Sequence, residues 1–275
     1  MNPENKSESL APAPRKSLTY SSYLKVDELL ALQVPKSEPA EHDEMLFIII
    51  HQVYELWFKQ LLHEFDKVCR DLTANRLYGV MASIKRCRTI MKVMVAQLDI
   101  LETMTPMEFN SFRNRLESAS GFQSAQFREL EFLLGYKRAN MIQFHPTGTP
   151  GRDVLLKRIS EPSIMDHFYD FLAARGYEIP AELRSREATA PTVANEQIQE
   201  HVLDIYRNHP DAAQLLESMV DFDEGLQEWR YRHVKMVERT IGMKPGTGGS
   251  SGAEFLRRTL FQPAFPDLWA IRHRL

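Results

Sequence analysis

The stretch MLFIIIHQVYELWFKQLLHEFDKVCRDL, residues 45–72, holds the longest apolar run of the sequence and decides the fold class. Its first half is apolar on nearly every side, which is typical of a helix buried in the middle of a domain. Its second half has the spacing of an amphipathic helix. The run ends at His51, far short of a membrane span. We therefore expect a long buried helix at the centre of a globular domain.

Other helical patterns follow this stretch, and alternating strand patterns are almost absent. Thr105 and Glu108 form a capping box around Pro106, which predicts a helix that begins there. The predicted fold class is all-α, a bundle of long helices with an inserted helical segment. Helices are expected within residues 18–33, 45–72, 80–104, 105–116, 122–135 and 211–241, with a loop at 141–152 and shorter helical pieces at 153–208.

Length and charge limit the classes of function. The 275 residues suffice for one large domain, here 18–275, preceded by a mobile tail at 1–17 that is rich in Pro, Ser and Ala. A net charge of −3 gives no reason to expect nucleic acid as a partner. Cys69 and Cys87 form no CxxC pair, so a reduced cytoplasmic protein is expected. The N-terminus lacks the apolar segment of a signal peptide.

His233 is the first candidate for chemistry. It belongs to an apolar stripe along the last long helix, so its ring faces the interior. A histidine on such a face is more often a packed core residue than a ligand, yet a neutral imidazole in an apolar slot is also what an axial haem ligand requires. The stripe consists of Leu215, Met219, Phe222, Leu226, Trp229, His233 and Val237.

His51 repeats this pattern on the central helix, where it shares a face with Phe47 and Glu55. Two histidines on two buried helices suggest that one holds a cofactor and the other faces a substrate. Arg113 is either a solvated arginine or a clamp for a carboxylate. The loop GTGGSSG, residues 246–252, is either a linker or a lid that offers the Thr247 hydroxyl to a ligand.

Four stretches together resemble the tryptophan 2,3-dioxygenase family, in the same order and at similar separations. The likeness extends from Leu18 to Leu275. It implies an all-helical homotetramer that encloses a b-type haem and uses dioxygen to cleave the indole ring of L-tryptophan. The four stretches are HDEMLFIIIHQVYELW (42–57), TPMEFNSFR (105–113), SGFQSAQFRELEFLLG (120–135) and WRYRHVKMVERTIGMKPGTGGSSG (229–252).

The resemblance also implies roles for single residues. The iron ligand of the family maps onto His233, and Ser120 and Gly121 lie beside the haem. The catalytic distal histidine maps onto His51, which accepts a hydrogen bond from the indole N–H. The substrate-binding positions map onto Phe47, Phe109, Arg113 and Thr247, and onto Tyr20 and Tyr23 in a segment that reaches a neighbouring subunit.

The sequence departs from the family pattern near these residues. Val53 and Tyr54 stand where Thr and Ser are usual, and Glu117, Ser118 and Ala119 differ from the usual residues before Ser120. Three alternatives therefore stay open. The protein is a monooxygenase that converts tryptophan or a methylated tryptophan to a 2-oxindole, a non-catalytic haem or tryptophan sensor, or a helical bundle without a cofactor.

Overall fold

The computed structural model describes residues 17–275, which fall into two units. Residues up to Val34 form the smaller unit, and residues from Pro35 to Leu275 form the larger. The smaller unit contains α1 (Tyr20–Leu24) and α2 (Val26–Leu30) in place of the one helix expected there, because Lys25 adopts a left-handed conformation with φ 56°. The expected tail at 1–17 lies outside the described residues except for its last residue.

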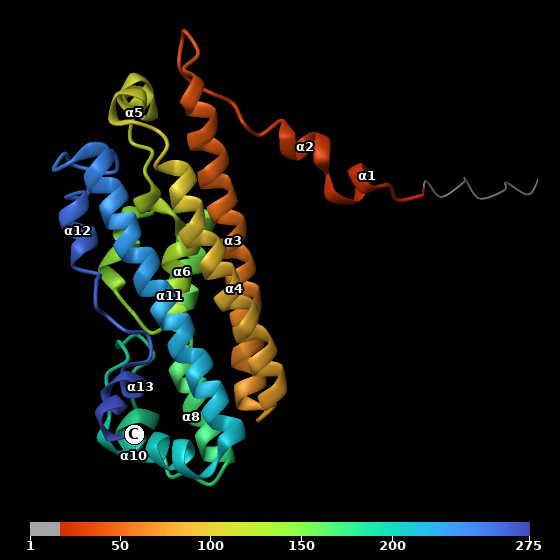
Figure 1. Ribbon diagram of the computed structural model, residues 1–275, viewed down its shortest axis with the longest axis vertical. Helices are drawn as coiled ribbons and strands as arrows, with labels where there is room; N and C mark the ends of the chain where they lie inside the picture. Colours follow the sequence, from red (N-terminus) through yellow and green to blue (C-terminus); the bar gives the residue numbers. More distant parts are fainter. Residues whose placement is uncertain (1–16) are drawn as a thin grey trace, which may run out of the picture. The chain divides into compact units, whose positions relative to one another are not determined.

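Three long helices form the core of the larger unit (Figure 1). They are α3 (His42–Thr73), α4 (Leu77–Leu101) and α11 (Pro210–Ile241). Helix α4 packs against both α3 and α11, and the residues between them are almost completely buried. The described residues contain helices and no strand, which confirms the all-α prediction. The helices expected at 45–72 and 80–104 both start three residues earlier than the apolar pattern suggested.

The first half of α3 is not buried on every side within this chain, so that expectation was wrong. Ile50 is buried, but Met45 and Ile49 are 38% and 41% exposed. The described part of the larger unit has no element that covers these two side chains fully. An apolar helix face left open in a single chain is a feature of interaction surfaces.

Shorter helices follow α4 and line one side of the bundle. The predicted capping box is confirmed, since the Thr105 side chain accepts from the Glu108 amide and Glu108 accepts from the Thr105 amide. The end predicted at Gly135 is confirmed by its φ of 95°. These elements are α5 (Pro106–Arg113), η1 (Asn114–Leu116), η2 (Gly121–Gln123) and α6 (Ala125–Leu133).

The segment expected as a loop at 141–152 is partly helical. The 3-10 helix η3 (Ala139–Phe144) covers its start, and α7 begins at Pro150, which suits the first position of a helix. The shorter pieces expected up to 208 are present, and α8 packs against α3 while α7 packs against α6. They are α7 (Pro150–Ile159), α8 (Ile164–Ala174), α9 (Ala181–Arg184) and α10 (Glu196–Asn208).

The C-terminal segment folds back along α11 (Figure 1). The buried Asp223 carboxylate accepts hydrogen bonds from the amides of Ala264 and Phe265 and from Trp269 Nε1. These contacts fix α13 (Pro266–Ala270) beside α11, while α12 (Ala253–Arg257) packs on α11 separately and η4 (Arg272–Arg274) follows α13.

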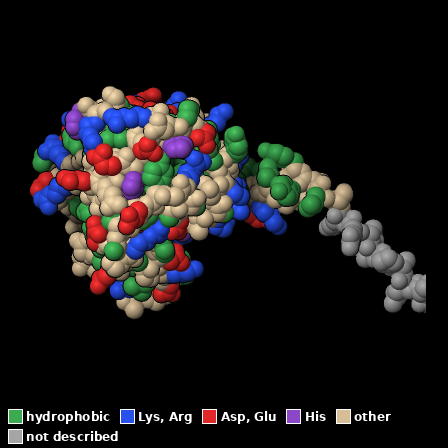
Figure 2. Space-filling view, turned by 90° about the horizontal axis from the view of Figure 1, so that it is seen from below, with side chains coloured by type: hydrophobic (Ala, Val, Ile, Leu, Met, Phe, Trp, Pro, Cys, Tyr) green, Lys and Arg blue, Asp and Glu red, His purple; other side chains and the backbone are tan. Residues whose placement is uncertain are grey.

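On the side seen in Figure 2, basic and acidic side chains are interspersed, and no large patch carries charges of a single sign. Among residues 17–275, no helix combines the length and the apolarity that crossing a membrane requires.

Candidate functional site

One large cavity opens in the larger unit between α3, α5, α6, α11 and the segment 246–259. It contains about 1660 Å³ of space, its open mouth included. Apolar and aromatic side chains form most of its wall.

His51 enters the cavity from α3. Its Nδ1 lies 2.7 Å from the carbonyl oxygen of Phe47, one turn earlier in the helix. A carbonyl can only accept, so Nδ1 carries the proton and donates, and Nε2 keeps its lone pair. Burial lowers the pKa of His51, against the smaller opposing effects of the Phe47 carbonyl and Glu55. At neutral pH His51 is therefore a neutral hydrogen-bond acceptor.

His233 borders the cavity from α11, and no hydrogen bond to its ring exists among the described residues. Burial, with a smaller contribution from His51, lowers the pKa of His233 to about 4. The ring stacks on Trp229, with ring centroids 5.2 Å apart and planes 15° apart. A neutral imidazole held in one orientation with free nitrogens is suited to binding a metal centre.

Trp229 is in turn held by a group of aromatic residues. Its ring centroid lies 5.2 Å from that of Phe127 and 6.2 Å from that of Tyr54. The Tyr54 hydroxyl donates to the carbonyl of Met94 on α4 at 2.7 Å. Tyr54 thus joins α3 to α4 behind the ring that supports His233.

An aromatic wall stands next to His51. The Phe47 ring centroid lies 4.1 Å from that of His51 and 5.7 Å from that of Phe109. Arg113, at the end of α5, borders the same part of the cavity, and its Nη2 donates to the carbonyl of Pro245 at 2.9 Å. A flat apolar slot with a guanidinium at its edge fits an aromatic ligand that carries an anionic group.

The glycine loop that follows α11 closes against residues 118–120. Thr247 Oγ1 donates to the carbonyl of Ala119 at 2.6 Å, so its lone pairs are still free to accept. A Cβ on Gly248 would lie 2.7 Å from the Cβ of Ser120, which is too close for any other residue. Ser120 and Gly121 also border the cavity. The glycines therefore allow the loop to approach the cavity wall closely.

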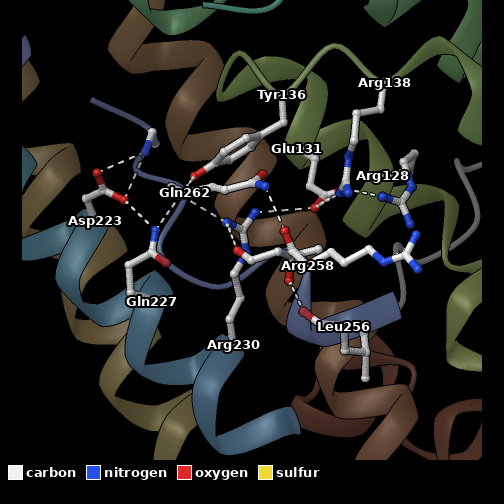
Figure 3. A network of polar contacts seen from close by, with 12 residues as sticks. Arg128, Glu131, Tyr136, Arg138, Asp223, Gln227, Arg230, Leu256, Arg258 and Gln262 are labelled. Carbon is white, nitrogen blue, oxygen red and sulfur yellow. Dashed lines mark hydrogen bonds and ion pairs between the residues drawn. The ribbon is translucent and has the colours of Figure 1, made fainter. Parts of the chain in front are cut away.

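All predicted site residues from Phe47 to Thr247 thus border one cavity, although α3, α5 and α11 are far apart in the sequence. Tyr20 and Tyr23 do not belong to this group, because they lie in the smaller unit. Four charged residues on the cavity wall were not predicted. They are Arg128, Glu131, Arg138 and Arg230 (Figure 3). The i,i+3 spacing of Arg128 and Glu131 was the one local signal for them.

Glu117, next to the loop contact, adopts φ 50° and ψ −114°, a conformation that glycine adopts more readily. Such strain costs roughly 1–3 kcal/mol, more than the ~0.5–1 kcal/mol by which glycine favours the unfolded chain. We expect Glu117→Gly to raise the Tm by about 2–4 °C in calorimetry. Ser118→Gly is the matched control and should lower it, because Ser118 has no positive φ to relieve. A lower Tm for Glu117→Gly would contradict the strain.

Comparison with protein families finds a match to the model described as tryptophan 2,3-dioxygenase over residues 7–149 and 201–275. The unmatched residues contain α7, α8 and α9. The chain is also similar to individual proteins of that name. Identity is 58% with one from Herpetosiphon aurantiacus, over 93% of this chain and 98% of that protein.

Two further relatives with the same name extend the comparison. Identity is 52% with a protein from Anaeromyxobacter sp. strain K, over 94% of this chain and 97% of the relative. It is 40% with one from Xanthomonas campestris pv. campestris, over 93% of this chain and 87% of the relative. These alignments cover nearly full length on both sides, so they compare whole domains.

Proposed function

This chain belongs to the tryptophan 2,3-dioxygenase family, and we propose that it cleaves the indole C2=C3 bond of L-tryptophan with dioxygen to give N-formylkynurenine. The observation that carries the proposal is the pair of neutral histidines on one cavity. His233 offers free ring nitrogens, and His51 offers a lone pair. The cavity that these two histidines border would bring together the haem, the substrate L-tryptophan and the co-substrate dioxygen.

The residues fit a b-type haem. His233 would be its ligand, since its pKa of about 4 leaves the imidazole neutral at physiological pH. Ser120 and Gly121 would lie along its edge, and the apolar wall would exclude water. Haem, when bound, supplies the iron centre that activates dioxygen, the second substrate.

The substrate would be oriented by residues at the other end of the cavity. Arg113 would pair with the carboxylate of the amino acid, and Thr247 would accept from its ammonium while it donates to Ala119. Phe47 and Phe109, which contact each other, would form the apolar wall against which the indole ring lies. Fixing both ends of the substrate lowers the entropy cost of the reaction, so orientation supplies part of the rate.

His51 would fix the position of the indole N–H. Its Nδ1 proton is held by Phe47, so its Nε2 is the atom that accepts from the substrate. The closed loop at 246–252 would keep water away from the reacting atoms.

The mass of the product tests the reaction. Under labelled dioxygen, reduced protein with haem and L-tryptophan is expected to give a product that has gained two labelled oxygen atoms and lost its indole ring. Gain of one oxygen atom would contradict cleavage and favour the 2-oxindole. Tryptophan bound without turnover in air would favour a sensor. The names of the relatives favour cleavage.

We also propose a homotetramer. The apolar face that α3 and α4 leave open supports it, since Met45, Ile49 and Leu56 lie in one stripe on α3, and Leu56 is 53% exposed. A second copy of this face is the proposed cover. Light scattering after size-exclusion chromatography should give the mass of four chains, and a monomer would contradict the proposal.

The smaller unit has a proposed role in the same assembly. Neither α1 nor α2 contains a buried residue, although Tyr20, Tyr23 and several leucines are apolar. We propose that Tyr20 and Tyr23 shield the substrate in a neighbouring subunit.

We also propose a reducing, cytoplasmic location, because the thiols of Cys69 and Cys87 are both buried and free.

A further inference from the structure

A cluster of buried charges forms part of the cavity wall (Figure 3). Arg128 and Glu131 come from α6, Arg138 follows that helix, and Arg230 comes from α11. Glu131 accepts from all three arginines: from Arg138 Nη2 at 2.5 Å, from Arg230 Nη2 at 3.3 Å and from Arg128 Nη1. All four residues border the cavity that His51 and His233 share.

The charges in this cluster do not balance. Three guanidinium groups meet one carboxylate, which leaves two positive charges. Burial lowers the pKa of Arg128; Glu131 raises it, while Arg138 and Arg230 lower it further. Glu55, the other carboxylate on the cavity wall, accepts from Gln126 and from none of these arginines. Uncompensated charge is costly in a site where Arg128 and Arg230 are only 3% exposed.

The cluster also has hydrogen-bond donors to spare. The Nε atoms of Arg128, Arg138 and Arg230 are buried and have no partner. Buried donors in folded proteins nearly always have an acceptor. Surplus charge and unpaired donors at the same place indicate that an anionic ligand with several oxygen atoms completes the cluster.

The cluster is separate from the proposed substrate clamp. Arg230 precedes His233 by three residues, less than one turn of α11. Arg113 instead contacts Pro245, beyond the end of α11 at Ile241. Ile241 lies eleven residues after Arg230, which corresponds to roughly 16 Å along the helix axis. The cavity therefore has two cationic ends, with His233 nearer to the cluster.

We propose that Arg128, Arg138 and Arg230, braced by Glu131, bind the two propionate carboxylates of the haem. The inference rests on the proposed function, because it assumes that haem is the group held by His233. Two carboxylates supply two negative charges for the two positive charges in excess. The apolar side chains of Phe58, Phe127 and Trp229 on the same cavity wall suit the uncharged part of the ring.

Titration of the haem-free protein with two ligands tests this assignment. The ligands are haemin and haemin dimethyl ester, in which both carboxylates are esterified, and binding is followed by the Soret band. We expect the unaltered protein to prefer haemin by roughly 100-fold, since charge-assisted contacts are about twice as strong as neutral ones. Arg138→Gln, at the more exposed position of the cluster, should reduce the preference to about tenfold or less, and Arg128→Gln should do the same.

The ester is an internal control for folding, because a variant that still binds it keeps both the cavity and His233. Arg232→Gln is the matched control, since Arg232 lies next to His233 in the sequence but pairs with Asp99 and Glu102 outside the cavity. Equal affinity of the unaltered protein for both ligands would overturn the inference, and so would a full preference in Arg138→Gln. If neither haemin nor its dimethyl ester gives the Soret band of a bound haem, the result would instead contradict the proposed haem function.

Discussion

His233→Ala is expected to bind haem roughly 100-fold more weakly, or worse, and to purify with almost no Soret absorbance. Loss of an outer partner of a metal ligand typically costs 10- to 100-fold in affinity, so loss of the ligand itself should cost at least as much. The measurement is the ratio of Soret to protein absorbance after expression with added haem precursor.

The control for this variant is His63→Ala, because His63 is exposed on the same long helix as His51 and does not border the cavity. It should keep its haem. Added imidazole should restore part of the Soret band in His233→Gly, where the space left by the ring is open to it. Full haem content in His233→Ala would show that His233 is not the ligand and that the histidine is a packed residue beside Trp229.

The long helices could be predicted from sequence because their signals are local. Apolar spacing located α3 and α11, and the pair Thr105 and Glu108 located the start of α5. Two of the errors depend on the surroundings of a segment, which its own sequence does not show. Whether Ile49 is covered depends on what packs beside α3. The start of α7 was missed because a proline such as Pro150 occurs in loops as well as at the first position of a helix.

The candidate site divides in the same way. His51 and His233 could be proposed because each lies on an apolar helix face that predicts its direction. Arg230 was missed because the same helical geometry places it off the stripe, toward solvent. In the folded chain it is buried, since residues 259–262 return across α11 and their carbonyls accept from its Nη1. A cluster assembled from α6, α11 and a C-terminal segment has no signature within any one of them.

Arg113→Ala is expected to weaken L-tryptophan binding roughly 10- to 150-fold and to leave the haem spectrum unchanged. A hydrogen-bonded contact to a charged group contributes about 1.5–3 kcal/mol, which corresponds to that range. The haem should be unaffected because Arg113 donates to Pro245 and is not among the arginines that pair with Glu131. Arg113→Lys should recover only part of the affinity, since an ammonium keeps the charge but lacks the two-pronged geometry. Spectral titration with tryptophan measures both effects.

A loss of tryptophan affinity in Arg113→Ala could also arise from a looser loop instead of a lost contact with the substrate carboxylate. Arg113 also donates to the carbonyl of Pro245, so its removal loosens the loop that carries Thr247. Tryptamine, which lacks the carboxylate, distinguishes the two roles. A clamp predicts that Arg113→Ala weakens tryptophan and leaves tryptamine binding nearly unchanged, whereas a loop anchor predicts equal losses for both. Arg115→Ala, at an exposed arginine two residues away, should change neither, and an unchanged tryptophan affinity in Arg113→Ala would exclude the carboxylate contact.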